Sequence, residues 1–134
     1  MSGLDEKDCL DRLERGLDEL RELNLLVPII VEGEKDVEAL RKLGLLGEII
    51  AFNRGLSVVE FCDWYERQYQ SVVLLTDWDR AGGRLCRLML KHFKGRVDCD
   101  VSFRKICVRC TKTRVVEGLP SFMHSLRRSV GAAE

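Results

Sequence analysis

Hydrophobic positions along the chain follow two patterns that alternate from one segment to the next. Between Asp5 and Leu23, leucines recur at every third or fourth position with charged residues between them, which predicts an amphipathic helix. Helical spacing and helix-start and helix-stop residues predict further helices over residues 34–43, 57–69, 85–93 and 121–128.

Short apolar runs between these helices predict strands. The runs cover residues 28–31, 49–52 and 72–76, and residues 97–103 alternate between apolar and polar side chains as a half-buried strand does. Because helices separate the strands, the order indicates βαβ units. The sequence therefore predicts an α/β fold with a mostly parallel sheet.

The length and the ends of the chain give further expectations. A chain of 134 residues suits one domain with its own core. The sequence has no apolar stretch of about 20 residues that could span a membrane, and its first residues have no signal-peptide character, so we expect a cytoplasmic protein. The six cysteines are then expected to stay reduced and to serve mostly as small core side chains.

Acidic residues directly follow two of the predicted strands. Glu32 follows the first strand, and Asp77 and Asp79 follow the third. The functional crevice of an open parallel sheet lies at the carboxyl ends of its strands, so we expect the three side chains to meet there. Carboxylates brought together repel one another, and hard cations such as Mg²⁺ prefer carboxylate oxygens. The pattern predicts a site for Mg²⁺, or Mn²⁺ in its place, although each acid alone suits an ordinary turn or helix cap.

Residues beside these carboxylates are candidates for substrate binding. Gly33 and Gly82 have no Cβ and would let a phosphate or the backbone come close. Asp36 lies one turn into the following helix, where it either reaches the same crevice or stabilises the helix N-terminus. Arg80 and Arg84 are expected on the crevice side at the start of the next helix, where they could hold flanking phosphates.

The formal charge of the chain sums to zero but is unevenly distributed. Residues 80–114 hold eleven of the 22 Lys and Arg residues and only two acids, whereas residues 1–79 are acidic. Such a basic segment can attract a nucleic acid. It can equally be a solvated helix face together with an edge strand protected by its charges.

The sequence supports a zinc site or a Walker-type nucleotide site less well than it supports the Mg²⁺ site. Cys107 and Cys110 have the spacing of half a zinc site, but a second close pair is missing, and Cys99 falls on the apolar phase of its predicted strand. Zinc is therefore disfavoured. The sequence also contains no Gly-x-x-x-x-Gly-Lys-Ser/Thr motif of a Walker-type ATPase.

The segment Val-Glu32-Gly33-x-x-Asp36 after one strand and Asp77-x-Asp79-x-x-Gly82 after a later one resembles the Toprim domain of topoisomerases, bacterial primases and ribosomal-RNA maturation nucleases. The resemblance covers roughly residues 26–110, between a helix at 5–23 and an extension at 111–134 of a single domain. It is closest in kind to small stand-alone Toprim proteins of archaea. It implies a Rossmann-like three-layer sandwich with about four strands, Glu32 as general acid or base, and Asp77 and Asp79 as holders of Mg²⁺.

These observations lead to the hypothesis of a Mg²⁺-dependent enzyme that cuts or joins phosphodiester bonds in RNA or DNA. An alternative is a nucleic-acid-binding module of the same fold that has no turnover of its own and acts with a protein partner. A small-molecule phosphatase is disfavoured, because in haloacid-dehalogenase-like enzymes the Asp-x-Asp pair belongs to the first strand. No membrane partner is expected, and the sequence leaves the oligomeric state open.

Overall fold

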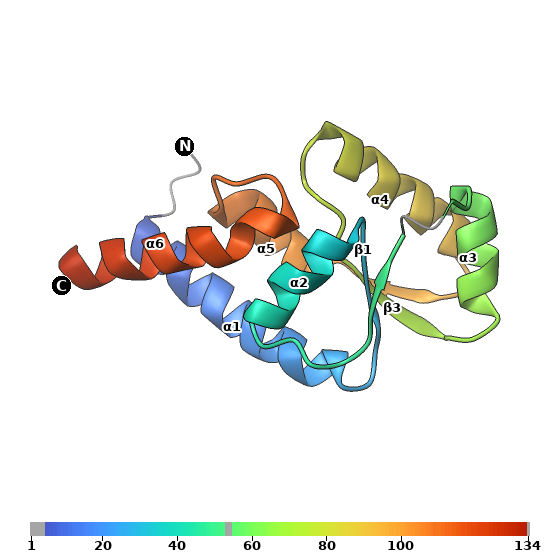
Figure 1. The fold of residues 1–134 in the computed structure, drawn as a ribbon, viewed down its shortest axis with the longest axis horizontal. Coiled ribbons are helices and arrows are strands. Elements are labelled where there is room, and N and C mark those ends of the chain that lie inside the picture. Colours follow the sequence, from blue (N-terminus) through green and yellow to red (C-terminus); the bar gives the residue numbers. More distant parts are fainter. Residues whose placement is uncertain (1–4, 53–54, 134) are drawn as a thin grey trace.

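The computed structural model describes residues 5–52 and 55–133, which form a parallel sheet between two layers of helices (Figure 1). In chain order the elements are α1 (Glu6–Asn24), β1 (Ile29–Val31), α2 (Glu34–Lys42), β2 (Ile49–Ala51), α3 (Val58–Glu66), β3 (Ser71–Leu74), α4 (Arg80–Phe93), β4 (Asp98–Asp100), α5 (Ser102–Cys110), the 3₁₀ helix η1 (Val116–Gly118) and α6 (Leu119–Ala133).

The four strands are paired in the order β2-β1-β3-β4, and every pairing is parallel. Helices α2, α3 and α4 connect consecutive strands, as parallel pairing requires. The chain runs from β1 to β2 in one direction and then crosses to β3 on the other side of β1, so the strand order reverses between β1 and β3. In open α/β sheets this reversal opens a crevice at the carboxyl ends of the two strands. The predicted α/β sandwich with about four parallel strands is confirmed.

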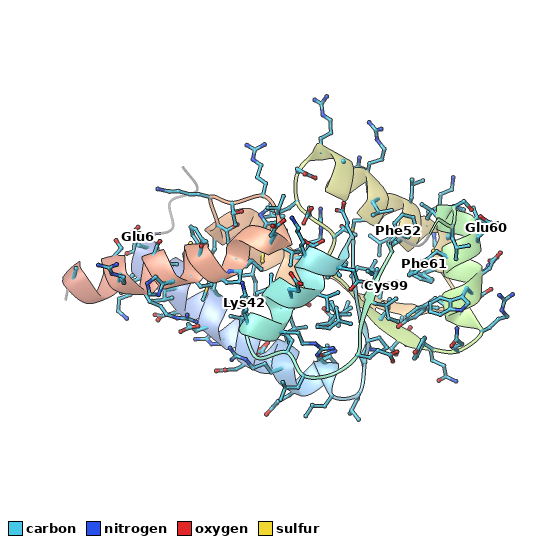
Figure 2. All side chains as sticks on the ribbon, viewed as in Figure 1. Glu6, Lys42, Phe52, Glu60, Phe61 and Cys99 are labelled. Atoms are coloured by element: carbon cyan, nitrogen blue, oxygen red, sulfur yellow. The ribbon has the colours of Figure 1, made fainter. Side chains whose placement is uncertain are left out.

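Side chains of the central strands alternate between two cores. Ile29 and Val31 of β1 face the core formed with α1, α2, α5 and α6, whereas Ile30 faces the core formed with α3 and α4. All three side chains are fully buried, which explains their continuous apolar run. In the second core the rings of Phe52 and Phe61, labelled in Figure 2, meet edge to face with centroids 5.2 Å apart. Packing on both faces holds the ends of β1 and β3 in place.

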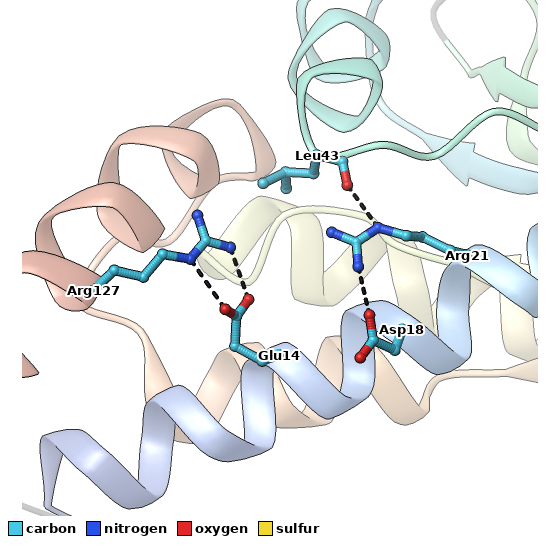
Figure 3. A network of polar contacts seen from close by, with 5 residues as sticks. All are labelled: Glu14, Asp18, Arg21, Leu43 and Arg127. Atoms are coloured by element: carbon cyan, nitrogen blue, oxygen red, sulfur yellow. Dashed lines mark hydrogen bonds and ion pairs between the residues drawn. The ribbon is translucent and has the colours of Figure 1, made fainter. Parts of the chain in front are cut away.

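Polar contacts connect α1 to the helices beside it (Figure 3). Arg127 of α6 makes two hydrogen bonds to the Glu14 carboxylate, at 3.1 and 2.7 Å, and this contact lowers the pKa of Glu14. Arg21 donates to the Leu43 carbonyl after α2 at 2.9 Å and pairs with Asp18 at 2.7 Å. Exposed ion pairs of this kind contribute at most about 1 kcal/mol each. The buried leucines of α1, and not its ion pairs, therefore hold this helix on the sheet.

The end of the sheet differs from the sequence prediction. The strand predicted over residues 97–103 ends at Asp100, and the helix α5, which was not predicted, begins at Ser102. Phe103, Cys107 and Cys110 are spaced by four and three residues and bury one face of this helix in the core that contains α1. Phe103 is also the last apolar position of the alternating run that starts at residue 97, so the alternation alone predicted a strand where the helix begins.

The predicted loop after β3 is also shorter than expected. Helix α4 begins at Arg80 instead of residue 85, so Gly82 and Gly83 lie in the helix and not in a loop. At the other end of the chain, α6 extends beyond the predicted 121–128 at both ends.

Two further observations concern the cysteines and the membrane. All six cysteines are free, and five of them are buried, in agreement with their predicted role as small core side chains. Over residues 5–52 and 55–133, none of the helices has the length and apolar composition that crossing a bilayer would need.

Candidate functional site

The carboxyl ends of β1 and β3 meet where the strand order reverses. Glu32 directly follows β1, and Asp77 comes shortly after β3. Beyond the last paired strand residues, the Leu75 N–H still donates to the Ile30 carbonyl at 2.9 Å. The backbones therefore stay side by side up to the two carboxylates.

Glu32 connects the two strand ends. Its Oε2 accepts a hydrogen bond from the backbone N–H of Asp77 at 2.9 Å. Burial raises the pKa of Glu32, the Asp77 amide opposes this shift, and the charges of Asp79 and Asp36 add to it. Glu32 is therefore a carboxyl group that holds its proton more strongly than an exposed glutamate.

Asp77 accepts from a segment much later in the chain. Its Oδ1 receives the backbone N–H of Val116, at the start of η1, at 2.8 Å. Burial raises the pKa of Asp77 to about 6, and the negative charges of Glu32, Asp36 and Asp79 add to this while the Val116 amide opposes it. The carboxylates of the candidate site thus lie close enough to act on one another.

Asp79 is the N-cap of α4. Its Oδ1 accepts from the Gly82 N–H at 2.8 Å, which satisfies one of the free amides at the helix start. The ordinary capping role that the sequence allowed for an acid in this position is therefore present. The same carboxylate still acts electrostatically on Glu32 and Asp77.

A cavity of about 740 Å³ lies beside Glu32 and Asp77. Its described walls carry five acids and one base, namely Glu32, Glu34, Asp36, Asp77, Glu117 and Lys35. Gly33 also lines it, and a Cβ built there meets no atom within 4 Å, so the space beside Glu32 is open. Such an acidic cavity repels a phosphate unless a cation is present.

Asp36 both reaches the crevice and stabilises the N-terminus of α2, the two roles that the sequence allowed. The side chain is buried and lines the cavity, while its Oδ2 accepts from the Gly33 N–H at 3.0 Å at the start of α2. Burial raises the pKa of Asp36, against the opposing Gly33 amide, and the charge of Glu117 adds to the rise.

The remaining predicted residues lie outside this cavity. Asp79, Arg80, Gly82 and Arg84 are absent from its described walls, to which α4 contributes Leu85. Arg80 and Arg84 are exposed on the first turns of α4. The structure thus brings Glu32, Gly33, Asp36 and Asp77 together at one opening and leaves Arg80 and Arg84 exposed on α4, outside its described walls.

The backbone of Asp77 lies so close to position 82 that only glycine fits there. A Cβ at this position would lie 2.0 Å from the carbonyl oxygen of Asp77, and the Gly82 carbonyl accepts from the buried Thr76 hydroxyl at 2.8 Å. Of the two possibilities that the sequence offered for this glycine, close approach of the backbone is the one that occurs. Helix α4 can therefore start directly beneath the Asp77 loop.

Sequence reasoning missed several residues that hold this loop. Arg104 of α5 donates to the carbonyl oxygens of Thr76 at 3.0 Å and Asp77 at 2.8 Å. Trp78 donates through Nε1 to the Thr113 carbonyl at 2.7 Å. These contacts join residues 27 to 35 positions apart, and no local pattern signals them.

The donor chemistry of the site fits Mg²⁺, although the carboxylates do not form a ready-made cage. Among the residues that the structure describes, no three His, Cys, Asp or Glu side chains are grouped to hold a metal ion. A backbone amide binds one oxygen of each of Glu32, Asp77 and Asp79. Mg²⁺ is often held by only one or two carboxylates, with waters and phosphate oxygens completing its shell. Two of these carboxylates would meet that requirement.

Comparison with known proteins identifies the family. A family model of the Toprim domain matches residues 27–108. The chain belongs to the Toprim family. The resemblance read from the two acidic motifs is therefore confirmed, and with it comes a family that typically binds Mg²⁺ and is associated with Mg²⁺-dependent enzymes of nucleic acids.

Relatives of this Toprim chain include small archaeal proteins. It is 39% identical over 102 residues to the UPF0292 protein TV1259 of Thermoplasma volcanium, an alignment that covers 75% of this chain and 86% of the relative. It is 41% identical over 92 residues to a UPF0292 protein of Thermococcus onnurineus, covering 66% of each chain. The solved structure of a protein from Aquifex aeolicus is similar with a TM-score of 0.67 at 25% identity, over 78% of this chain and 95% of that one.

Gly82→Ala is expected to destabilise the protein because the new Cβ would collide with the Asp77 carbonyl. Overpacking of this kind costs roughly 1–3 kcal/mol in the free energy of unfolding. Gly83→Ala is the matched control: its Cβ would lie 3.5 Å from the flexible end of Arg87, so alanine should be neutral or stabilise α4 by up to about 1 kcal/mol. Urea unfolding measures both variants, and equal stability of the two would contradict the close approach.

The raised pKa of Asp77 predicts how stability depends on pH. Burial raises the pKa of the Asp77 carboxyl to about 6 in the folded state, from 3.8 for the free side chain. The contribution of Asp77 to the stability of the folded state is therefore expected to fall as pH rises from about 4 to 6. In metal-free buffer, Asp77→Asn should raise the melting temperature at pH 7 and give little advantage at pH 4. Asp98→Asn, at an exposed position of β4, is the control; the same gain from Asp77→Asn at both pH values would refute the assignment.

Proposed function

We propose that this Toprim protein carries out Mg²⁺-dependent chemistry on phosphodiester bonds of RNA or DNA, with cleavage as the first activity to test. The observation that carries the proposal is the hydrogen bond from the Asp77 amide to Glu32 Oε2, which joins the ends of β1 and β3 at the strand-order reversal. Ligands of α/β sheets bind at such a reversal.

Each carboxylate has a role that fits its surroundings. Burial raises the pKa of Glu32, which brings it closer to the range where a general acid or base works at neutral pH. Asp77 and Asp79 would hold the ion. A bound Mg²⁺ lowers the negative charge on a phosphate oxygen. The open space at Gly33 leaves room for that phosphate beside Glu32.

The acidic cavity supports a requirement for a cation. Five acids and one lysine in the described walls would keep a nucleic acid away on electrostatic grounds alone. Phosphate can approach Glu32 only when positive charge from an ion, or from neighbouring arginines, offsets this field. The substrate and the metal ion are therefore expected to bind together.

A row of bases on α4 offers a path for the flanking phosphates. Arg80, Arg84, Arg87 and Lys91 are exposed, and their spacing of four, three and four residues places them on one face of the helix. The row starts directly after Asp79. Contacts of this kind bind the phosphate backbone without reading its sequence, so they favour RNA or DNA over a small phosphomonoester.

A second candidate is a nucleic-acid-binding module that does not turn over alone. The exposed bases on α4 favour it, because their contacts would bind the phosphate backbone whether or not the carboxylates catalyse a reaction. Such a module would bind nucleic acid through the same α4 row and would gain activity only in the complex.

The cleavage proposal is tested with single- and double-stranded RNA and DNA in Mg²⁺ or Mn²⁺. We expect Glu32→Gln to lower the rate about 100-fold or more, since general acid–base catalysis contributes roughly 10²–10⁴, and Asp77→Asn with Asp79→Asn to abolish metal-dependent cleavage. Glu38→Gln, an exposed position on α2, is the control. Cleavage unchanged by the carboxylate variants would exclude the proposed roles. A wild type that binds nucleic acid but cuts none of the four substrates would favour the second candidate.

Nucleic-acid binding is tested separately through the α4 row. Arg84→Glu with Arg87→Glu should weaken binding and flatten the dependence of log Kd on log salt, since each lost phosphate contact removes about 0.7–0.9 from the slope. Arg12→Glu with Arg15→Glu makes the same charge change on exposed positions of α1 and should have a smaller effect. Fluorescence anisotropy at several salt concentrations measures both, and equal losses for the two pairs would argue against a binding face on α4.

A further inference from the structure

The part of the chain between α5 and α6 packs over the loop that carries Asp77 and Asp79. We call residues 111–118 the strap. It lies beyond residues 27–108, which the Toprim family model matches. Its contacts with the loop are therefore not part of the matched domain and need an explanation from this chain.

Trp78 is attached to the strap at both its backbone and its side chain. Its backbone N–H donates to the Arg114 carbonyl at 2.9 Å. The indole Nε1–H donates to the Thr113 carbonyl at 2.7 Å and contacts the Thr111 hydroxyl at 3.0 Å. Because Trp78 stands between Asp77 and Asp79, these bonds restrict the loop on both sides of the residue.

Val116 reaches Asp77 directly. Its backbone N–H donates to Oδ1 of Asp77 at 2.8 Å, and hydrogen bonds to a charged acceptor are stronger than those between neutral groups. One carboxylate oxygen is thereby fixed, which sets the direction of the other. The next residue, Glu117, lines the same cavity as Glu32 and Asp77.

The core keeps the strap in place. The Val116 side chain is fully buried, as are Leu119 and Met123 of α6, in the core that α1 and α2 share. Gly118 lies so close to Thr113 that a Cβ there would come 2.2 Å from the threonine hydroxyl. The strap is thus a packed element with two separable parts: side chains that fill the core, and amide and carbonyl groups that hold the loop.

We propose that the strap is a positioning element of the candidate site, in which the Val116 amide sets the orientation of the Asp77 carboxylate for metal binding. This inference rests on the proposed function only in taking Asp77 to be a metal ligand. Metal affinity then depends on a segment outside the family domain, and Val116 and Trp78 act through Asp77 without touching the substrate.

A proline at position 116 tests the amide itself. Val116→Pro removes the N–H that Asp77 accepts. The substitution suits the backbone, because Val116 is the first residue of η1, where proline is favoured, and Val115 has the extended conformation (φ −132°, ψ 146°) preferred before proline. Val116→Ala is the matched comparison, since it keeps the N–H and removes core packing.

Calorimetric titration with Mn²⁺ measures the effect, in the full chain and at a temperature where circular dichroism shows each variant folded. Val116→Pro should weaken Mn²⁺ binding about tenfold relative to wild type and at least fivefold relative to Val116→Ala. Val130→Ala, which opens the same core from the end of α6, should bind as wild type does. If Val116→Pro does not fold, Trp78→Phe decides, because it keeps an aromatic ring and loses the indole donor, and it should also weaken Mn²⁺ binding.

The outcomes separate this inference from the proposed function. Mn²⁺ binding that is lost in Asp77→Asn but kept in Val116→Pro, or in Trp78→Phe where that variant decides, overturns the positioning role alone. A wild type that binds no Mn²⁺, or binding that Asp77→Asn leaves unchanged, overturns the metal site and the positioning role with it. A purely structural strap predicts equal affinities for the proline and alanine variants, and that result also overturns the proposal.

Discussion

The hydrogen bond from the Asp77 amide to Glu32 joins positions 45 residues apart, and the candidate site depends on it. It forms because β1 and β3 are neighbours and run in the same direction, so their carboxyl ends reach the same edge of the sheet. That pairing is in turn fixed by the two cores, which bury both faces of β1. The geometry of the site is therefore a consequence of core packing.

Concentrating carboxylates at this edge has an electrostatic cost. Burial raises the pKa of Glu32, Asp36 and Asp77, and the groups raise one another's further. The protein offsets part of this with backbone amides, since a hydrogen bond to a charged group contributes about 1.5–3 kcal/mol. Arg104 is a nearby cation, but its described hydrogen bonds go to the Thr76 and Asp77 carbonyls and not to a carboxylate. The backbone amides offset only part of the desolvation and repulsion of the carboxylates, and this favours binding of a cation. Proteins commonly retain such local instability where function requires it.

Much of the sheet could be predicted because its signals are local. Continuous apolar runs predicted β1, β2 and β3. Once β1 and β3 pair in parallel, their carboxyl ends bring Glu32 and Asp77 to the same edge of the sheet. The fourth strand and α5 were misjudged because Phe103, the last apolar position of the alternating run that starts at residue 97, is also the first buried position of a helical face with Cys107 and Cys110. The sequence left open whether a phosphate or the backbone approaches Gly82 in a predicted loop, and the structure shows that Gly82 lies in α4 with the Asp77 carbonyl against it.

The carboxylates of the site differ in whether their hydrogen-bond partners are local or remote in the sequence. Sequence reasoning can find the local partners and misses the remote ones. Asp36 and Asp79 bind amides three residues away at helix starts, an arrangement that local spacing predicts and that leaves each carboxylate near a helix N-terminus. Asp77 has no such local partner among its described hydrogen bonds, and its carboxylate is bound by an amide 39 residues later. Its orientation therefore depends on whether the chain after α5 is packed. The same aspartate motif, placed in a chain with a different ending, would keep the caps of α2 and α4 but would have to hold Asp77 in another way.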